Sequence, residues 1–309
     1  MLKRRCYSTP SVVVVCGALI MCVRITATTA RHIIGDEDKE RKTVTLIVHV
    51  TDKRGNPVPP ASFQPVEVTE HGEKLQVVSG PKNAGPAQVG FLIDSNFHQR
   101  NVLQLEKETL ETLFLKLKKE KARAFVMNYG TGIRSSGPLT EDWDGLKNFN
   151  RSIEADLDKR NYTILLFDAL KRAIDTLSDG PGTRAIVLFA EGNGYGNSVT
   201  WKTVARLAEQ NQIACYVVLF ADHTFYGTKS IRHYGRDLVE LVPQTGGEFW
   251  EAGSSSHKAA EVAQKIVREI DSQSLLEVAP SVNRGDTFHR VKVTSRGRRL
   301  DAQAGYFDH

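Results

Sequence analysis

The stretch Gln88-Val-Gly-Phe-Leu-Ile-Asp94-Ser95-Asn96-Phe97-His98 decides how this chain folds. The residues between Gln88 and Asp94 are apolar, which indicates a strand buried on both faces. Asp94 ends that strand in a polar turn, and an amphipathic helix is predicted to begin soon after it, near Val102. Ligands of open α/β sheets gather outside the carboxyl ends of the strands, so Asp94 is the first candidate for a functional site.

Strand and helix patterns alternate from this stretch onward, and three of the strands are continuous apolar runs. This alternation predicts an α/β fold with a doubly wound, mostly parallel sheet that helices cover on both faces. We predict strands at 88–94, 122–128, 184–190, 213–220 and 247–251, and helices at 101–119, 144–157, 165–178, 199–211, 232–243 and 256–272.

Short β patterns flank the α/β portion on both sides. Alternating residues and turn signals between 40 and 80 predict a small β module, and the segment 275–309 is predicted as a β-rich tail. The α/β domain between them is expected to cover 87–272.

The first thirty residues resemble a secretory signal peptide. Three basic residues near the start precede an apolar run from Ser11 to Val23 and then small residues up to Ala30, and the run is too short for a membrane span. Segment 1–30 is therefore predicted to be a signal peptide, which places the protein outside the cytoplasm, secreted or in the periplasm or cell envelope, with no membrane span after its removal. An uncleaved N-terminal anchor is the alternative interpretation.

Charge and cysteine content exclude several classes of protein. The formal charge of +5 falls to about +1 without the signal, and no basic stripe interleaved with aromatics follows it, so nucleic acid is not an expected partner. Cys215 alone remains in the mature chain, inside an apolar run, and is interpreted as a buried core residue.

Six motifs, in one order, resemble those of von Willebrand factor type A (vWA) domains. The motifs in the flanks resemble those of the vWA-related proteins that are abundant in acidobacteria. The resemblance covers about residues 42–307. The motifs are the strand that ends at Asp94, Phe167-Asp168-Ala169-Leu170, the strand from Ala185 to Gly192, Thr245-Gly246-Gly247, the turn from Val50 to Val58, and Ala304-Gly-Tyr-Phe. Asp168 lies in the first turn of its predicted helix, where a carboxylate favours a capping role.

The resemblance implies a metal-ion-dependent adhesion site, which vWA domains build from Asp-x-Ser-x-Ser, a Thr and a distal Asp to hold Mg²⁺ and a partner's carboxylate. This chain keeps Asp94 but departs from the pattern elsewhere: Asn96 and His98 replace the serines, Ile164 takes the Thr position beside Thr163, and Glu191 replaces the distal Asp. We therefore expect a degenerate site. The predicted ligand-binding residues are Asp94, Asn96, His98, Thr163 and Glu191, framed by loops 129–137 and 222–236.

No cofactor is expected at this site, although two metal interpretations stay open. Mg²⁺ or another divalent cation would use oxygens of Asp94, Asn96 and Glu191, whereas His98 would favour a transition metal.

The leading hypothesis is a non-enzymatic vWA protein that binds an unidentified protein partner, as in cell adhesion. The alternative is a structural component of an envelope assembly with no ligand at the former metal site. Metal-assisted hydrolysis by Asp94, His98 and Glu191 is a third hypothesis, although one histidine gives it weak support.

Overall fold

A computed structural model describes residues 43–52, 54, 56–58, 65–82, 85–158, 160–178, 182–220, 235–280, 288–295 and 299–307. The predicted signal peptide 1–30 and most of the predicted loop 222–236 lie outside the described residues. Within the described part of the chain, no helix combines the length and the apolar character that crossing a membrane requires.

The α/β part contains a six-stranded sheet in the order β6-β5-β4-β7-β8-β9. All neighbouring strands are parallel except β6, which runs antiparallel to β5. The apolar runs of β4, β7 and β8 are buried along almost their whole length, as strands covered on both faces must be. The strands are β4 Gln88–Asp94, β5 Arg123–Tyr129, β6 Ile133–Ser135, β7 Arg184–Ala190, β8 Ile213–Leu219 and β9 Phe249–Glu251.

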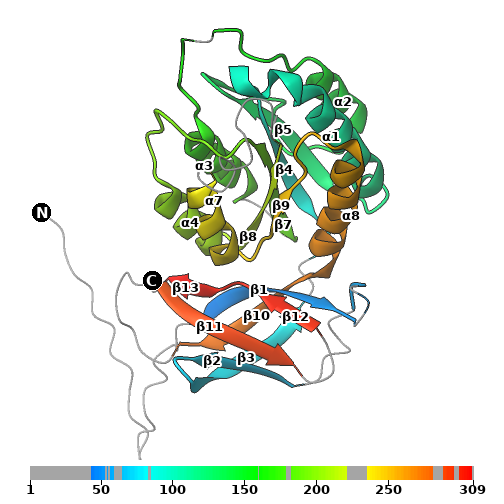
Figure 1. Cartoon of the computed structure of the whole chain (residues 1–309). Helices are drawn as coiled ribbons and strands as arrows, with labels where there is room; N and C mark the ends of the chain where they lie inside the picture. Colours follow the sequence, from blue (N-terminus) through cyan, green and yellow to red (C-terminus); the bar gives the residue numbers. More distant parts are fainter. Residues whose placement is uncertain are drawn as a thin grey trace, which may run out of the picture. The chain divides into compact units, whose positions relative to one another are not determined.

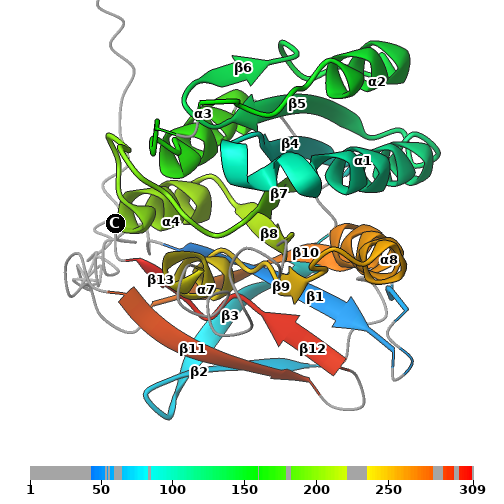
Figure 2. The ribbon, with the colours of Figure 1, turned by 45° about the horizontal axis from the view of Figure 1, so that its top comes forward.

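Helices cover both faces of this sheet (Figures 1 and 2). One face packs against α1 Leu103–Leu117, α2 Trp143–Arg151 and α8 Ser256–Ser272 through a shared apolar cluster. The other face packs against α3 Leu166–Leu177, α4 Trp201–Gln210 and α7 Arg236–Gln244 through a second cluster. The α/β class predicted from the sequence is confirmed.

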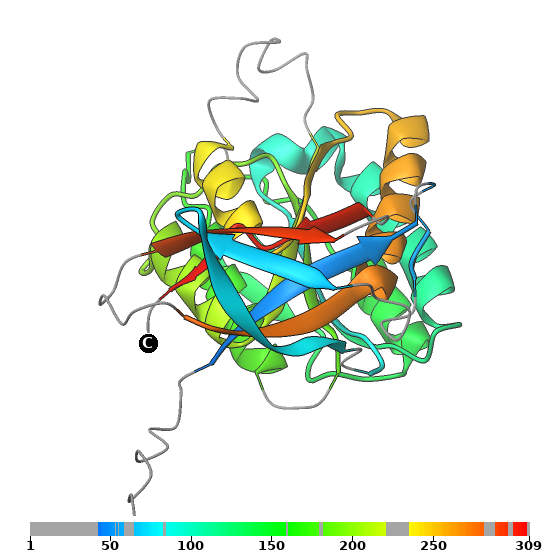
Figure 3. The ribbon, with the colours of Figure 1, turned by 90° about the horizontal axis from the view of Figure 1, so that it is seen from below.

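The prediction of one doubly wound sheet with separate β pieces at its two ends is incomplete, because those pieces form a sheet of their own. Residues from both ends of the described chain build a seven-stranded antiparallel sheet in the order β12-β1-β10-β3-β2-β11-β13 (Figure 3). Its strands are β1 Val44–Thr51, β2 Val66–Glu70, β3 Glu73–Lys82, β10 Gln273–Ala279, β11 Phe288–Ser295, β12 Arg299–Ala302 and β13 Gly305–Phe307. The domain bounds 40–80, 87–272 and 275–309 remain predictions. β10 begins at Gln273 and so crosses the predicted start of the tail at 275.

The two sheets meet where β1 contacts α8 and the turn after α7. The His49 ring lies between the carbonyl oxygens of Gly246 and Glu269, at 2.7 and 3.1 Å. Gly246 has a φ of +76°, and a Cβ there would come within 2.9 Å of Ile47. Only glycine accommodates both this backbone conformation and this close approach.

Candidate functional site

Asp94 lies at the end of an interior strand, with β5 on one side of β4 and β7 on the other. The chain then turns sharply, because the Ser95 amide donates to the Tyr129 carbonyl at 2.7 Å and the Ser95 hydroxyl contacts the same oxygen at 2.9 Å. The carboxyl ends of β4, β5 and β7 thus lie together, as the position of ligand sites in α/β sheets requires.

Donors from two loops surround the Asp94 carboxylate. Its Oδ1 accepts hydrogen bonds from the backbone amide of Asn96 at 3.0 Å and from the Asn96 side-chain amide at 2.7 Å. Its Oδ2 accepts one from the Glu191 backbone amide at 3.5 Å. Both oxygens are therefore engaged by nitrogen donors of the chain itself.

Asn96 also caps the short 3-10 helix Phe97–Asn101, because its Oδ1 accepts from the His98 amide at 2.6 Å. Asp94, Asn96 and Glu191 are buried, with exposed fractions of 0, 4 and 6%, and His98 is half-buried. The structure brings Asp94, Asn96 and Glu191 together, with His98 beside them.

Thr163 belongs to the neighbouring loop. Its backbone amide donates to Asn161, and its side chain lies against Gly196. Ile164, at the position where the family has Thr, forms a two-residue antiparallel bridge with Tyr195 instead, with N to O distances of 2.9 and 3.0 Å. An apolar residue there supplies no hydroxyl ligand, and its backbone joins two loops.

Glu106 is a third buried carboxyl that the sequence analysis did not single out. It is 0% exposed on α1, and neither carboxylate oxygen has a hydrogen-bond partner among the described residues. Burial, followed by the charges of Asp94 and Glu191, raises its pKa well above the usual value. A sequence signal was present, because Glu106 occupies the helical face of Leu103, Leu110 and Leu113, where an acid is unusual.

Burial and neighbouring negative charge oppose the ionisation of Asp94 and Glu106. Burial first, and Glu191 second, raise the pKa of Asp94 well above its ordinary value, while the amide donors of Asn96 and Glu191 act in the opposite direction. The pKa of Tyr129, which contacts the Phe189 carbonyl at 3.1 Å, is raised by burial and then by the same acids. The surroundings therefore favour the protonated forms of Asp94 and Glu106.

The arrangement does not suit the divalent cation that the vWA resemblance implies. Mg²⁺ needs oxygens turned toward one point, but both Asp94 oxygens accept N–H groups and the Asn96 oxygen accepts the His98 amide. Over the ranges that the structure describes, no group of three or more His, Cys, Asp or Glu is placed to hold a metal ion.

Exposed apolar side chains lie on the loops that surround this closed cluster. Leu157, Tyr162 and Tyr195 are 81, 72 and 53% exposed. Backbone hydrogen bonds hold their loops in place: the Asp156 amide donates to the Ser95 carbonyl at 2.7 Å, and the Leu165 amide donates to Gly130 at 3.0 Å. We call Leu157, Tyr162 and Tyr195 the apolar rim.

Asp168 and Asn197 hold the loop of Tyr195 against the start of α3. Asn197 Oδ1 accepts from the amides of Phe167 and Asp168 at 2.8 and 3.2 Å, and therefore caps α3. Asp168 in turn accepts from the amide and hydroxyl of Ser198, at 3.0 and 2.7 Å. Asp168 thus ties down the loop before α4, a different role from the capping of its own helix that the sequence suggested.

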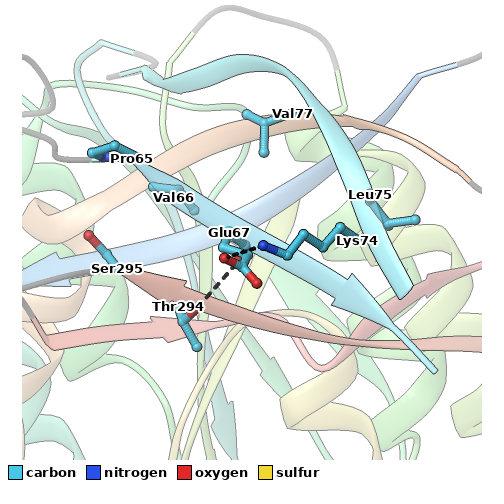
Figure 4. Close-up of a pocket in the computed structure, with 8 residues that line it drawn as sticks. All are labelled: Pro65, Val66, Glu67, Lys74, Leu75, Val77, Thr294 and Ser295. Carbon is cyan, nitrogen blue, oxygen red and sulfur yellow. Dashed lines mark hydrogen bonds and ion pairs between the residues drawn. The ribbon is translucent and has the colours of Figure 1, made fainter. Parts of the chain in front are cut away.

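A separate hollow of about 660 Å³ lies on the seven-stranded sheet, along β2, β3 and the end of β11 (Figure 4). Its polar feature is the ion pair between Lys74 and Glu67, at 3.1 Å, and much of the remaining lining is aliphatic. This lining offers no nucleophile paired with a base, and we assign it no chemistry.

Comparison with known proteins gives structural matches only. No protein-family model and no curated protein matches the sequence. Similar solved structures include BatB, a conserved hypothetical protein from Bacteroides thetaiotaomicron, with 16% identity, a TM-score of 0.47, and coverage of 60% of this chain and 100% of that one. The vWF domain of the type V pili tip protein Mfa5 from Porphyromonas gingivalis has 11% identity, a TM-score of 0.47 and coverage of 60 and 97%.

The VWA domain of SpRpn10 is also similar, with 14% identity, a TM-score of 0.42 and coverage of 58% of this chain and 94% of that one. Solved vWA domains are thus among the structures similar to this chain. The chain resembles a vWA-domain protein.

Proposed function

We propose that this protein binds another protein through the apolar rim at the carboxyl ends of β4, β5 and β7, and that it does so without catalysis and without a metal ion. The observation that carries the proposal is the exposure of Leu157, Tyr162 and Tyr195 on loops held by backbone hydrogen bonds. Tyrosine is enriched at the centres of protein interfaces, and pre-ordered loops reduce the entropy cost of binding.

The buried acids support a positioning role for the former metal site. Asp94 organises the loops of Asn96 and Glu191 through its hydrogen bonds, and it is too deeply buried to touch a partner. The partner's contacts are therefore expected on the rim and on the half-exposed Thr163 and His98. The predicted signal peptide supports an envelope or extracellular partner.

A pull-down from the envelope fraction of the source cells tests the proposal with matched variants. The rim variant replaces all three rim residues with serine: Leu157→Ser, Tyr162→Ser and Tyr195→Ser. The control variant replaces three exposed apolar residues elsewhere: Val78→Ser, Leu115→Ser and Val239→Ser. We expect the rim variant to lose the partner that the wild type and the control retain. The wild type and the control should recover the same amount of partner in EDTA as in Mg²⁺.

Two outcomes contradict the proposal. Retention of the partner by a folded rim variant would place the interface elsewhere, and would favour an assembly role through another surface. Loss of the partner in EDTA, with recovery in Mg²⁺, would show that binding depends on a metal ion. Thermal shift with Mg²⁺ and Mn²⁺ gives an independent measure, because a ligand at 100 times its dissociation constant adds about 2.7 kcal/mol.

A further inference from the structure

A second hollow, of about 470 Å³, lies where α4 meets the seven-stranded sheet, and none of its lining residues belongs to the apolar rim. The volume suits a small organic molecule. The lining comes from the first turns of α4, the last residue of α7 and the ends of β11 and β13: Trp201, Lys202, Thr203, Arg206, Gln244, Phe288 and Phe307.

Aromatic rings form the apolar part of the lining. Phe288 and Phe307 are cross-strand partners whose rings meet edge to face at 5.1 Å between centroids. Phe307 is 8% exposed, whereas Phe288 and Trp201 are half-buried and keep part of their surface open. These rings offer a surface to a flat apolar group, and such contacts strengthen binding beyond the area that they bury.

Two cations share the hollow with the rings. Lys202 and Arg206 are four residues apart on α4 and so lie on one face of the helix. The Lys202 Nζ is 5.8 Å from the centroid of the Trp201 ring, and the Arg206 guanidinium carbon is 5.2 Å from that of Phe307. Among the described lining residues, the charged side chains are these two cations, so that part of the lining is positive.

α4 itself carries one acid, Glu209. Glu209 lies outside the lining and is 4% exposed, and burial raises its pKa to about 8, against the opposing effects of the Phe307 amide and Arg206. Its carboxyl is therefore mostly neutral at pH 7. Arg206 keeps its charge, since guanidinium groups stay protonated in proteins.

We propose that this hollow binds a small organic anion with an aromatic body, of the class of an arylalkyl carboxylate. The ring of the ligand packs among Trp201, Phe288 and Phe307, and its carboxylate meets Lys202 and Arg206. Charge-assisted hydrogen bonds to a carboxylate are about twice as strong as neutral ones, so the anion is preferred over an uncharged molecule of the same shape.

Three probes test the proposal on the full chain: 3-phenylpropionate, its neutral amide 3-phenylpropanamide, and acetate. Trp201 reports binding by fluorescence, because it lines the hollow, whereas Trp143 and Trp250 lie outside the lining and are buried. We expect a saturable signal with 3-phenylpropionate, binding of the amide weaker by about tenfold, and no saturation with acetate. Calorimetry confirms the affinity, and Trp201→Phe removes the fluorescence change.

Charge variants locate the site. Lys202→Gln is expected to weaken binding of 3-phenylpropionate severalfold, and the pair Lys202→Gln with Arg206→Gln by about tenfold or more. Lys118→Gln, at the exposed C-cap of α1, is the matched control and leaves the affinity unchanged. Because Lys202 is exposed, its variant keeps the test valid even if the change at Arg206 disturbs folding.

Equal binding of acid and amide, wild-type affinity in a folded Lys202→Gln variant, or no saturation up to about 10 mM would each overturn the proposal. None of these results bears on the apolar rim, which is tested separately.

Discussion

At the scale of single residues, the side chain of Asn96 explains how Asp94 is accommodated in the interior. A buried carboxylate needs donors or a cation, and the Asn96 side chain supplies a neutral N–H at 2.7 Å. The same side chain accepts from the His98 amide, so one residue satisfies both the acid and the start of the next helix. We infer that the amide replaces the cation as the partner of Asp94.

Glu106 gives a prediction about pH, because the folded state raises its pKa above the unfolded value. An acid whose pKa is raised on folding binds more protons in the folded state, so its contribution to stability falls as pH rises above the unfolded value of about 4.3. Glu106→Gln cannot ionise. We expect this variant to be more stable than the wild type at pH 8, by about 1–3 kcal/mol, with the difference shrinking toward pH 4.

Urea denaturation at pH 4, 6 and 8 measures this difference. Glu108→Gln, an exposed acid on the same helix, is the control, and its difference from the wild type should change little with pH. A Glu106→Gln variant less stable than the wild type at pH 8 would show that the carboxylate is paired in the folded protein.

The candidate site could be predicted from the sequence only in part. The buried strand and the acid at its end follow from local pattern, and this placed Asp94 correctly at the end of an interior strand. The conflict between Glu106 and its apolar neighbours is visible in the spacing, but the spacing alone does not show that the carboxyl is buried. The rim residues were missed, because the exposure of Tyr162 and Tyr195 depends on how two loops pair.

At the scale of elements, the hydrogen bonds between α3 and the loop before α4 lead to a second prediction. Asp168→Ala removes the acceptor for Ser198 and Val199, and should release the loop that carries Tyr195. We expect faster amide hydrogen exchange at residues 195–199 and a loss of stability of about 1–3 kcal/mol.

The matched control for this exchange experiment is Asp175→Ala, which removes an exposed ion pair with Lys171 on the same helix and should leave the loop unchanged. Unchanged exchange in Asp168→Ala would mean that Asn197 and the bridge between Ile164 and Tyr195 hold the loop without Asp168.

The elements themselves were largely predictable, since buried strands and amphipathic helices each carry a periodic signal. The short β6 was missed, because three residues give no readable period. The start of the β-rich tail was placed late, at 275, because β10 follows α8 without a turn residue between them: Ser272 ends the helix and Gln273 begins the strand.

At the scale of the whole molecule, the seven-stranded sheet joins residues more than 200 positions apart. β1 pairs with β10 and β12, and β2 pairs with β11. Alternation predicts that each segment is a strand but carries no information on its distant partner, so the sequence suggested two separate β pieces. The pairing requires both ends of the described chain to be present before either β segment can bury its apolar face.

His49 at the junction of the two sheets makes the last prediction. Burial lowers the pKa of its ring, against the opposing effect of the Gly246 and Glu269 carbonyls. A base whose pKa is lowered on folding binds fewer protons in the folded state, so its contribution to stability is lost as pH falls below the unfolded value of about 6.5.

We expect His49→Gln to be less stable than the wild type at pH 8, by about 1–2 kcal/mol, because the contacts of the ring are lost. The difference should narrow at pH 5, where the wild type must either protonate a buried ring or open the junction. Urea denaturation at pH 5, 6.5 and 8 measures it, with the exposed His257→Gln as the control. A difference that widens at pH 5 would show instead that His49 is charged in the fold and paired with Glu269, whose Oε2 is 3.3 Å from its Nδ1.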